Sequence, residues 1–392
     1  FNLAVAFKGY SAPLSLIIAF PFLLLIPGLL ISFILHIKAK GPWHYVYYAT
    51  AISLVFLMAL GLTVNTLLPL VGIDEALQTR PLLLCLDIAI VVLGLAAWLN
   101  MRPQFEKIIL LGPALKQWPR YIVPLPLVAL AAMGATSLNN GGTNLITIAM
   151  LLLLLADFFY VFIRSKSMRS GEIMWHVFCW GLALLLMTSL RGWYVTGHDV
   201  QREFYVFELT HANWHWSIGD FSSPYNACLS ITLLPTMLVS LINIGDAYVY
   251  KLLFQIIFAM VPVAVYMLAR GMATRKLALL SVLYFLAFPT FFTDMPMLNR
   301  QEIAFVLFAG MMLLLNDKLN THLNKRILFL MFGGGIVLAH YSTTYSMLAI
   351  FGVAVVIRYL FERWWFYSFV SRIFRFLKRD VPGFIWPVVR SK

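Results

Sequence analysis

Charged residues are scarce in this sequence. They make up 11% of its 392 residues, whereas hydrophobic residues make up 61% and the mean hydropathy is +0.86. Soluble domains contain roughly 25% charged and about 45–50% apolar residues, so the composition excludes an ordinary soluble protein. Cysteine is also rare. Its three residues are widely spaced and form no CxxC pair, which gives no support to a disulfide framework or a zinc site.

Long apolar runs recur along the whole chain, and several reach the ~20 residues that a helix needs to cross a bilayer. They predict an all-α, polytopic transmembrane bundle of about 11 spans, in which Pro21 and Pro27 kink or break the first. The runs at 277–292 and 302–315 are short for a span. The expected spans are 12–36, 46–70, 81–99, 121–137, 144–163, 173–190, 247–269, 277–292, 302–315, 327–340 and 344–361.

Lysine and arginine outnumber aspartate and glutamate by 29 to 16. The excess gathers in alternate loops between the apolar runs, and the positive-inside rule makes these loops cytoplasmic. The intervening loops, including 191–246, then face the extracytoplasmic side of a cell membrane. Cations placed in this way match an anionic lipid leaflet, so we expect membrane lipids as partners and no nucleic acid. After Ser368, apolar residues and cations alternate at helical spacing, which predicts a helix on the cytoplasmic leaflet.

The loop after the sixth expected span is polar, aromatic and charged, and such a concentration beside a membrane indicates a functional site. Asp199 and Glu203 are four residues apart, so a helix over this segment places both carboxylates on one face. We therefore predict that they are catalytic. Arg202 lies between them and either neutralises them or binds an anionic ligand. The structural alternative is an exposed helix with Asp199 as its N-cap.

Two histidines follow in the same loop, in HANWH from His211 to His215. This spacing can bind a metal on a helix, but no glutamate stands where a zinc protease needs its base, and we predict no metal site here. The tryptophans suit sugar stacking, and they also suit the aromatic belt of a membrane interface. An apolar stretch over 225–242 predicts a second juxtamembrane or re-entrant helix.

Two later outward loops carry further candidates. In TDMPMLNRQE, Arg300 suits the grip of a phosphate, with Asp294 and Glu302 beside it as substrate-binding residues. The alternative is a surface ion pair between Arg300 and either carboxylate. In the loop before the last span, His340 and Tyr341 begin HYSTTY, where His340 binds a phosphate or sugar hydroxyl, or caps a helix.

Together, the GHDxQxE loop at Gly197–Glu203, the HYSTTY segment and the layout of 173–361 resemble the glycosyltransferase C (GT-C) superfamily. Large polytopic membrane proteins of prokaryotes with the same two segments are similar. The resemblance implies an outward acidic loop with two juxtamembrane helices, a lipid-linked sugar donor, and Asp199 as general base or metal ligand. Whether a divalent cation such as Mg²⁺ or Mn²⁺ takes part stays open. Most members place the acidic loop after their first span, and the departure here is the five spans that precede the module at 173–361.

We therefore expect a membrane glycosyltransferase that uses a polyprenyl-phosphate donor on the extracytoplasmic face, in cell envelope glycosylation. The alternatives are a transporter or flippase of a lipid-linked substrate and a non-catalytic assembly subunit. Three regions are expected: an N-terminal module of about five spans (1–170) that offers a docking surface for protein partners, a GT-C-like module (171–361) and a basic amphipathic segment (362–392). The start at Phe1 without a signal-peptide pattern predicts a piece of a longer protein.

Overall fold

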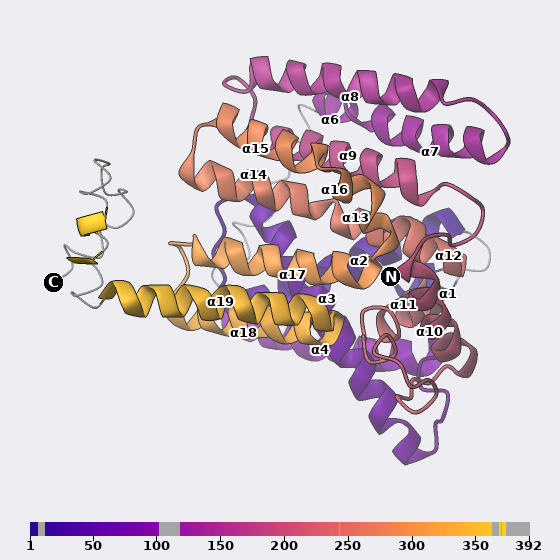
Figure 1. Ribbon diagram of the computed structural model, residues 1–392. Helices are drawn as coiled ribbons and strands as arrows, with labels where there is room; N and C mark the ends of the chain where they lie inside the picture. Colours follow the sequence, from indigo (N-terminus) through magenta and orange to yellow (C-terminus); the bar gives the residue numbers. More distant parts are fainter. Residues whose placement is uncertain (7–11, 102–117, 243, 363–367, 370, 374–392) are drawn as a thin grey trace. The chain divides into compact units, whose positions relative to one another are not determined.

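The computed structural model describes residues 1–6, 12–101, 118–242, 244–362, 368–369 and 371–373, and every regular element in these ranges is helical (Figure 1). The chain forms two compact units, Phe1–Tyr341 and Ser342–Lys392. The first holds nearly all the helices, and the second holds most of α19. The predicted amphipathic segment at 362–392 falls almost entirely outside the described residues.

The first unit contains long helices joined by short helical turns. In chain order they are α1 (Asn2–Ala6), α2 (Ala12–Ile34), α3 (Pro42–Leu67), η1 (Pro69–Val71), α4 (Thr79–Met101), α6 (Trp118–Ile122), α7 (Leu125–Asn139), α8 (Leu145–Arg164), α9 (Ser170–Ser189), α10 (Asp199–Asn213), α11 (Leu233–Leu241), α12 (Asp246–Tyr248), the π-helical turn η3 (Val249–Leu253), α13 (Phe254–Phe258), α14 (Met260–Met272), α15 (Arg275–Ala287), α16 (Pro289–Thr293), η4 (Met295–Met297), α17 (Asn299–Leu315) and α18 (His322–Ala339). The last helix is α19 (Tyr341–Glu362).

Eight helical segments among the described residues are long and apolar enough to cross a membrane. The pair formed by α15 and α16–η4, bent by 62°, raises the number to nine if it is one broken span. This confirms an all-helical fold with several candidate membrane spans. The eight segments are Leu16–Ile34, Pro42–Val71, Thr79–Asn100, Arg120–Asn139, Leu145–Arg164, Ser170–Ser189, Asp246–Met272 and Tyr341–Phe361. The finer count of about 11 spans stays a prediction.

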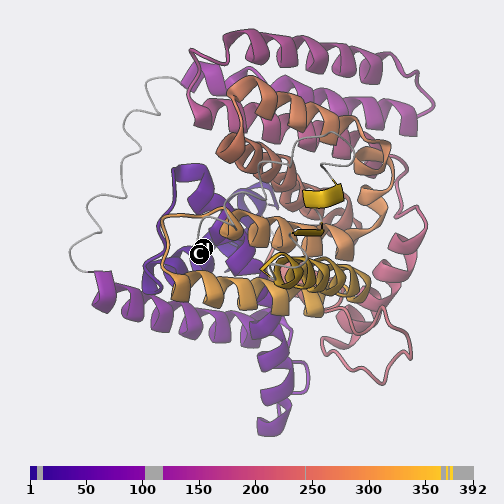
Figure 2. The same cartoon turned by 60° about the vertical axis from the view of Figure 1, so that its left-hand side comes forward.

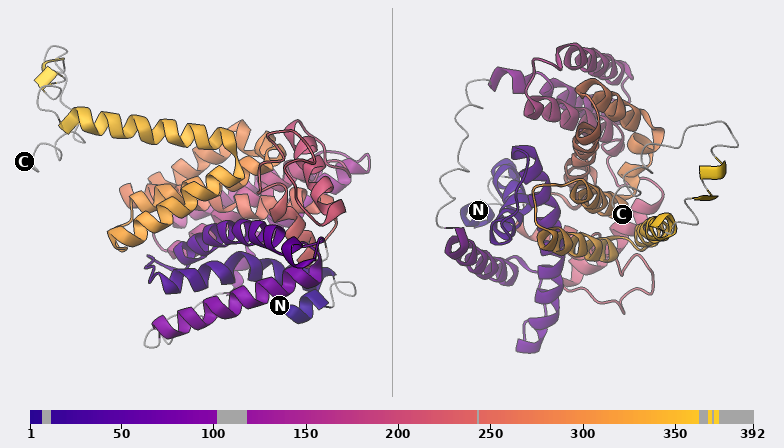
Figure 3. Two further views of the ribbon diagram at one scale, coloured as in Figure 1. Left: turned by 90° about the horizontal axis from the view of Figure 1, so that it is seen from below. Right: turned by 90° about the vertical axis from the view of Figure 1, so that its left-hand side faces the viewer.

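Helix α9 lies at the centre of the first unit. Its apolar window is 78% buried, compared with 17% for α4, so α9 belongs to the core whereas α4 exposes most of its surface to its surroundings. It packs against α7, α14 and α16. Figures 1 and 2 show α7 and α8 beside α9, and the right panel of Figure 3 looks along several of these helices. Buried aromatic side chains such as Trp180 and Tyr250 fill the interior.

Helix α2 runs without interruption through Pro21 and Pro27, so the chain does not break there, whereas the predicted kink stays a prediction. A proline removes one backbone hydrogen bond, but close packing on neighbouring helices keeps such a helix continuous. The packing here is tight at Gly28, where a Cβ atom would lie 1.9 Å from the carbonyl oxygen of Ala49 in α3. The Gly28 N–H donates to Ser53 Oγ of α3 at 2.8 Å.

We predict that Gly28→Ala destabilises the protein, because the added methyl group forces α2 away from α3. Overpacking of this kind costs about 1–3 kcal/mol. Gly94→Ala in α4 is the matched control, since nothing lies within 4 Å of its added Cβ. The midpoint of thermal unfolding in detergent measures both variants. A Gly28→Ala protein as stable as Gly94→Ala would contradict the close contact between the two helices.

Candidate functional site

Helix α10 carries the first part of the candidate site. It begins at Asp199 and buries Val200, Glu203 and Phe207 on the face that points into the protein. Phe204, whose ring contacts that of Phe207, completes an apolar stripe on this face and is half-buried. The spacing of four residues places Asp199 and Glu203 on one side of the helix, as the sequence predicts. The apolar stripe therefore packs on the helices beneath it, with a carboxylate in its middle.

Arg300, in the first turn of α17, lies between Asp199 and Glu203 and contacts both side chains. Its Nη2 atom donates to Asp199 Oδ2 at 2.8 Å, and its Nε atom lies 3.2 Å from Glu203 Oε1. Arg300 is 3% exposed and the side chain of Glu203 is fully buried, whereas the Asp199 side chain is 36% exposed. The guanidinium group thus sits below a carboxylate that reaches the surface and beside one that does not.

Glu203 also caps helix α17 from α10. The backbone N–H of Asn299, the first residue of α17, donates to Glu203 Oε2 at 2.9 Å. The preceding residue, Leu298, offers no side-chain cap. A helix N-terminus leaves backbone N–H groups without partners, and Glu203 supplies the missing acceptor for one of them. Burial outweighs these contacts and raises the pKa of Glu203 to about 8, close to neutral pH.

Aromatic rings cover the guanidinium group of Arg300. Its Cζ atom lies 3.8 Å from the centre of the Tyr225 ring and 5.2 Å from that of the Tyr341 ring. His340 precedes Tyr341 at the end of α18. Its burial, and to a smaller extent the positive charge of Arg300, lowers the pKa of His340 to about 4. Arg300 Nη1 is buried and has no hydrogen-bond partner in the described part of the chain. One guanidinium donor is thus left for a further acceptor.

A chain of hydrogen bonds places Tyr225 over Arg300. Asn65 at the end of α3 exchanges two hydrogen bonds with the backbone of Trp216, at 2.8 and 2.7 Å. Trp216 Nε1 donates to the carbonyl of Asn226 at 2.9 Å. Further on, Ser230 Oγ donates to the carbonyl of Ala339 at 2.9 Å, which ties this loop to the end of α18. The loop and α18 therefore bring Tyr225 and Tyr341 to the same guanidinium group.

The start of the polar loop is fixed by Lys251, which is nearly buried in η3. Its Nζ atom donates to the carbonyl oxygens of Arg191 at 3.3 Å and Tyr194 at 3.0 Å, and also to that of Gly192. Lys251 also lines a small cavity next to the first turn of α10, together with Val200 and Met297. Lys251 therefore anchors residues 191–194 of the loop to the core, shortly before Asp199 in the chain.

The other predicted site residues lie apart from Arg300. Arg202 is exposed on α10, and Asp294 is exposed and accepts a hydrogen bond from Thr293 at 3.1 Å. Glu302 is fully buried and contacts Asn299 at 2.9 Å. The structure thus brings together Asp199, Glu203, Arg300, His340 and Tyr341. In the HANWH segment, His211 Nδ1 lies 3.0 Å from Asp246 Oδ2.

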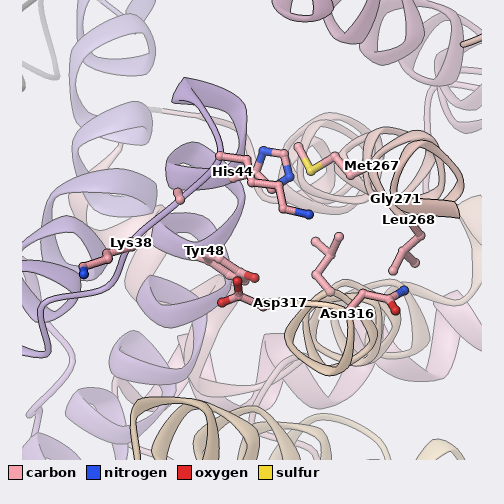
Figure 4. A pocket seen from close by; sticks show the side chains of 11 residues that line it. Lys38, His44, Tyr48, Met267, Leu268, Gly271, Asn316 and Asp317 are labelled. Atoms are coloured by element: carbon pink, nitrogen blue, oxygen red, sulfur yellow. The ribbon is translucent and has the colours of Figure 1, made fainter. Parts of the chain in front are cut away.

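A separate pocket lies at the opposite end of α17 (Figure 4). His44, Tyr48, Asn316 and Asp317 line it, together with lysines of the loop after α2. Asn316 directly follows α17, about 24 Å along the helix axis from Arg300 at 1.5 Å per residue. The pocket and the Arg300 cluster are therefore two different sites.

Sequence reasoning missed Tyr225 and Asn299 as members of the site. Tyr225 was expected inside a helix over 225–242, but α11 begins only at Leu233. The backbone before α11 pairs with the end of α18 and does not continue the helix, because Leu229 N–H donates to the carbonyl of Leu338 at 2.8 Å. A tyrosine in an aromatic loop and an asparagine before an arginine carry no signal that distinguishes them from their neighbours.

Comparison with known proteins finds no matching family model, no matching curated protein and no matching solved structure.

We predict that Glu203 makes the stability of the protein depend on pH. Its pKa in the folded protein, about 8, lies above the ordinary value of 4.5, so the folded state binds an extra proton between these pH values. The stabilisation is complete below about pH 4.5 and is lost as pH rises through about 8, with a slope of at most about 1.4 kcal/mol per unit. Glu203→Gln flattens this slope in thermal unfolding from pH 5 to 9. The exposed Glu208→Gln on the same helix keeps it, and an unchanged slope in Glu203→Gln would refute the assignment.

Proposed function

We propose that the protein is a membrane glycosyltransferase of the GT-C type, which transfers a sugar from a polyprenyl-phosphate-linked donor to an acceptor hydroxyl. The observation that supports this most is Arg300. A guanidinium group buried beside the outer polar loop keeps one donor without a partner, and a phosphate oxygen is the acceptor that suits it. Because the basic loops predict the cytoplasmic side, the proposed site faces the extracytoplasmic side.

The transfer step uses two groups of this chain. Asp199 accepts the proton of the acceptor hydroxyl, whose oxygen forms a bond to the anomeric carbon of the donor sugar. The bond between that carbon and the phosphate oxygen breaks, and the electron pair leaves with the lipid phosphate. Arg300 stabilises the charge that develops on this phosphate. Both groups lie at one place, since the two side chains are 2.8 Å apart.

The ion pair between Asp199 and Arg300 gives the lipid-linked sugar donor a second effect when it binds. In the structure, Asp199 Oδ2 accepts a hydrogen bond from Arg300 Nη2, so this oxygen is already occupied. A lipid phosphate that binds Arg300 competes for the same guanidinium group. The donor therefore releases Asp199 as the acceptor hydroxyl is about to react. Glu203 is buried behind Arg300, so in this proposal it positions the guanidinium group and does not touch the substrate.

A divalent cation fits this arrangement poorly. Asp199 is already paired with a guanidinium group, whose charge repels a metal ion at the same carboxylate. Glu203 is enclosed between Arg300 and the N-terminus of α17. In the described part of the chain, no three histidine, cysteine, aspartate or glutamate residues form a group that could hold a metal ion. The proposed step therefore uses the protein's own side chains.

We predict that Asp199→Asn lowers sugar transfer about 10²–10⁴-fold, because it removes the base, and that Arg300→Lys lowers it about 10²–10³-fold. Lysine keeps the charge but cannot hold a phosphate and a carboxylate in one planar group. Transfer is measured with a radiolabelled polyprenyl-phosphate sugar in proteoliposomes. Glu208→Gln, an exposed carboxylate of the same helix, serves as the control and retains transfer.

The same proteoliposomes separate the alternatives. A flippase or transporter moves labelled lipid or substrate across the bilayer without forming a glycosidic bond, and an assembly subunit does neither. Full transfer by Asp199→Asn would exclude the proposed base. Movement of the donor lipid without transfer, lost in Arg300→Lys, would replace the transferase by a flippase.

A further inference from the structure

A ring of four polar atoms lies inside the first unit, behind Arg300. Gln255 Nε2 donates to the carbonyl oxygen of Tyr250 at 3.1 Å and to Glu302 Oε2 at 3.2 Å. Asn299 Nδ2 donates to the same two oxygens, at 3.2 and 2.9 Å. The two amide nitrogens and the two oxygens therefore alternate around a closed ring. All four residues are at most 1% exposed.

The ring leaves several polar atoms without partners. Gln255 Oε1, Asn299 Oδ1 and Glu302 Oε1 are buried and accept no hydrogen bond from the described residues. Glu302 also pairs with no cation in that part of the chain, since Arg300 pairs with Asp199 and Glu203. A buried carboxyl in these surroundings is neutralised either by a proton or by a cation, and each buried oxygen without a donor adds to the cost of the site. A cation that replaces the proton of Glu302 would meet oxygens without partners here.

Rotation of the two amide groups changes what the ring presents. An amide turned by 180° exchanges its oxygen and nitrogen with almost no change in shape. For Gln255 and Asn299 this rotation gives up the four hydrogen bonds that their nitrogens donate. It breaks none to their oxygens, which accept none from the described residues. It turns the ring into four oxygens with sides of 2.9–3.2 Å. A flat ring of this size has its centre about 2.2 Å from each corner, within the ~2.0–2.6 Å at which oxygens bind small metal ions.

We propose that Tyr250 O, Gln255 Oε1, Asn299 Oδ1 and a Glu302 oxygen form a buried binding site for Na⁺. The single carboxylate balances one positive charge, whereas Mg²⁺ or Ca²⁺ would leave a net charge in a dry interior. K⁺ needs longer bonds to oxygen than this ring allows. All ligands are oxygens, which suits a hard cation, and none is shared with the catalytic pair Asp199 and Arg300.

The backbone around the ring supports a ligand site. Tyr250 belongs to the π-helical turn η3, and π-helical turns frequently occur at functional sites. Asn299 connects the ring to the Arg300 cluster, because its backbone N–H donates to Glu203 while its side chain belongs to the ring. Bound Na⁺ therefore fixes the first turn of α17, and with it Arg300. The inference does not depend on the reaction at Asp199, since it concerns ion binding and stability.

The test is the thermal unfolding of the full chain in detergent, with NaCl replaced stepwise by KCl or by N-methylglucamine chloride at constant ionic strength. Na⁺ is expected to raise the unfolding midpoint by several degrees in a saturable way, because a ligand of the folded state stabilises it by mass action. K⁺ is expected to have little effect. Binding of ²²Na⁺ to the purified protein is expected to reach one ion per chain. Equal midpoints in NaCl and N-methylglucamine chloride would overturn the proposal and leave the ring as a hydrogen-bonded contact only.

Variants locate the effect. Glu302→Gln keeps the shape but removes the charge, and Gln255→Leu removes one ring oxygen. Both are expected to lose the Na⁺-dependent rise and ²²Na⁺ binding. Glu172→Gln is the matched control, a buried carboxyl of α9 that lies 3.8 Å from Arg120 and should keep the full response. If Glu302→Gln and Gln255→Leu both fold and retain the response, Na⁺ binds elsewhere and the assignment is wrong. If the unchanged protein binds Na⁺ but transfers no sugar, the result counts against the transferase proposal alone.

Discussion

A single buried arginine holds together α10, the loop before α11 and the end of α18. Arg300 has lost nearly all contact with solvent, and a guanidinium group in that situation needs acceptors and opposite charge around it. Helix α10 supplies them with Asp199 and Glu203, and the loop before α11 supplies the Tyr225 ring. The positions of α10, of this loop and of the end of α18 therefore depend on one side chain.

The same demand explains why two of the carboxyl groups differ. Asp199 and Glu203 lie one helical turn apart, yet one meets the surface while the other is enclosed. The exposed group is open to solvent, and the enclosed group holds α17 and Arg300 in place. Behind them, Glu302 lies deeper still and has only neutral partners. Polar groups thus continue from the surface into the interior along the first turn of α17.

The sequence indicated the class of fold and several residues that the structure gathers around Arg300, because both rest on local patterns. Apolar runs predict helices, and charged residues that follow them, such as Asp199 and Arg300, predict where polar side chains lie. The sequence offers Asp294 and Glu302 as ion-pair partners of Arg300, whereas its pairing with Asp199 depends on the fold. Burial is not a local property, so the enclosure of Glu203 and Glu302 could not be foreseen. Tyr225 and Gln255 depend on contacts between segments far apart in the chain. Likewise, Pro21 and Pro27 predict a kink or a break, and α2, which packs on α3, continues through both prolines.

The contact at Gly28 also bears on how a long lipid could reach the site. Because a missing Cβ lets α2 approach the backbone of α3 directly, these two helices cannot separate or slide past one another without losing that contact. They form a closed seam along the side of the protein. If the proposed function is right, a polyprenyl chain that enters from the bilayer would have to pass between other helices. A residue that takes no part in the proposed site would then restrict the path of the lipid.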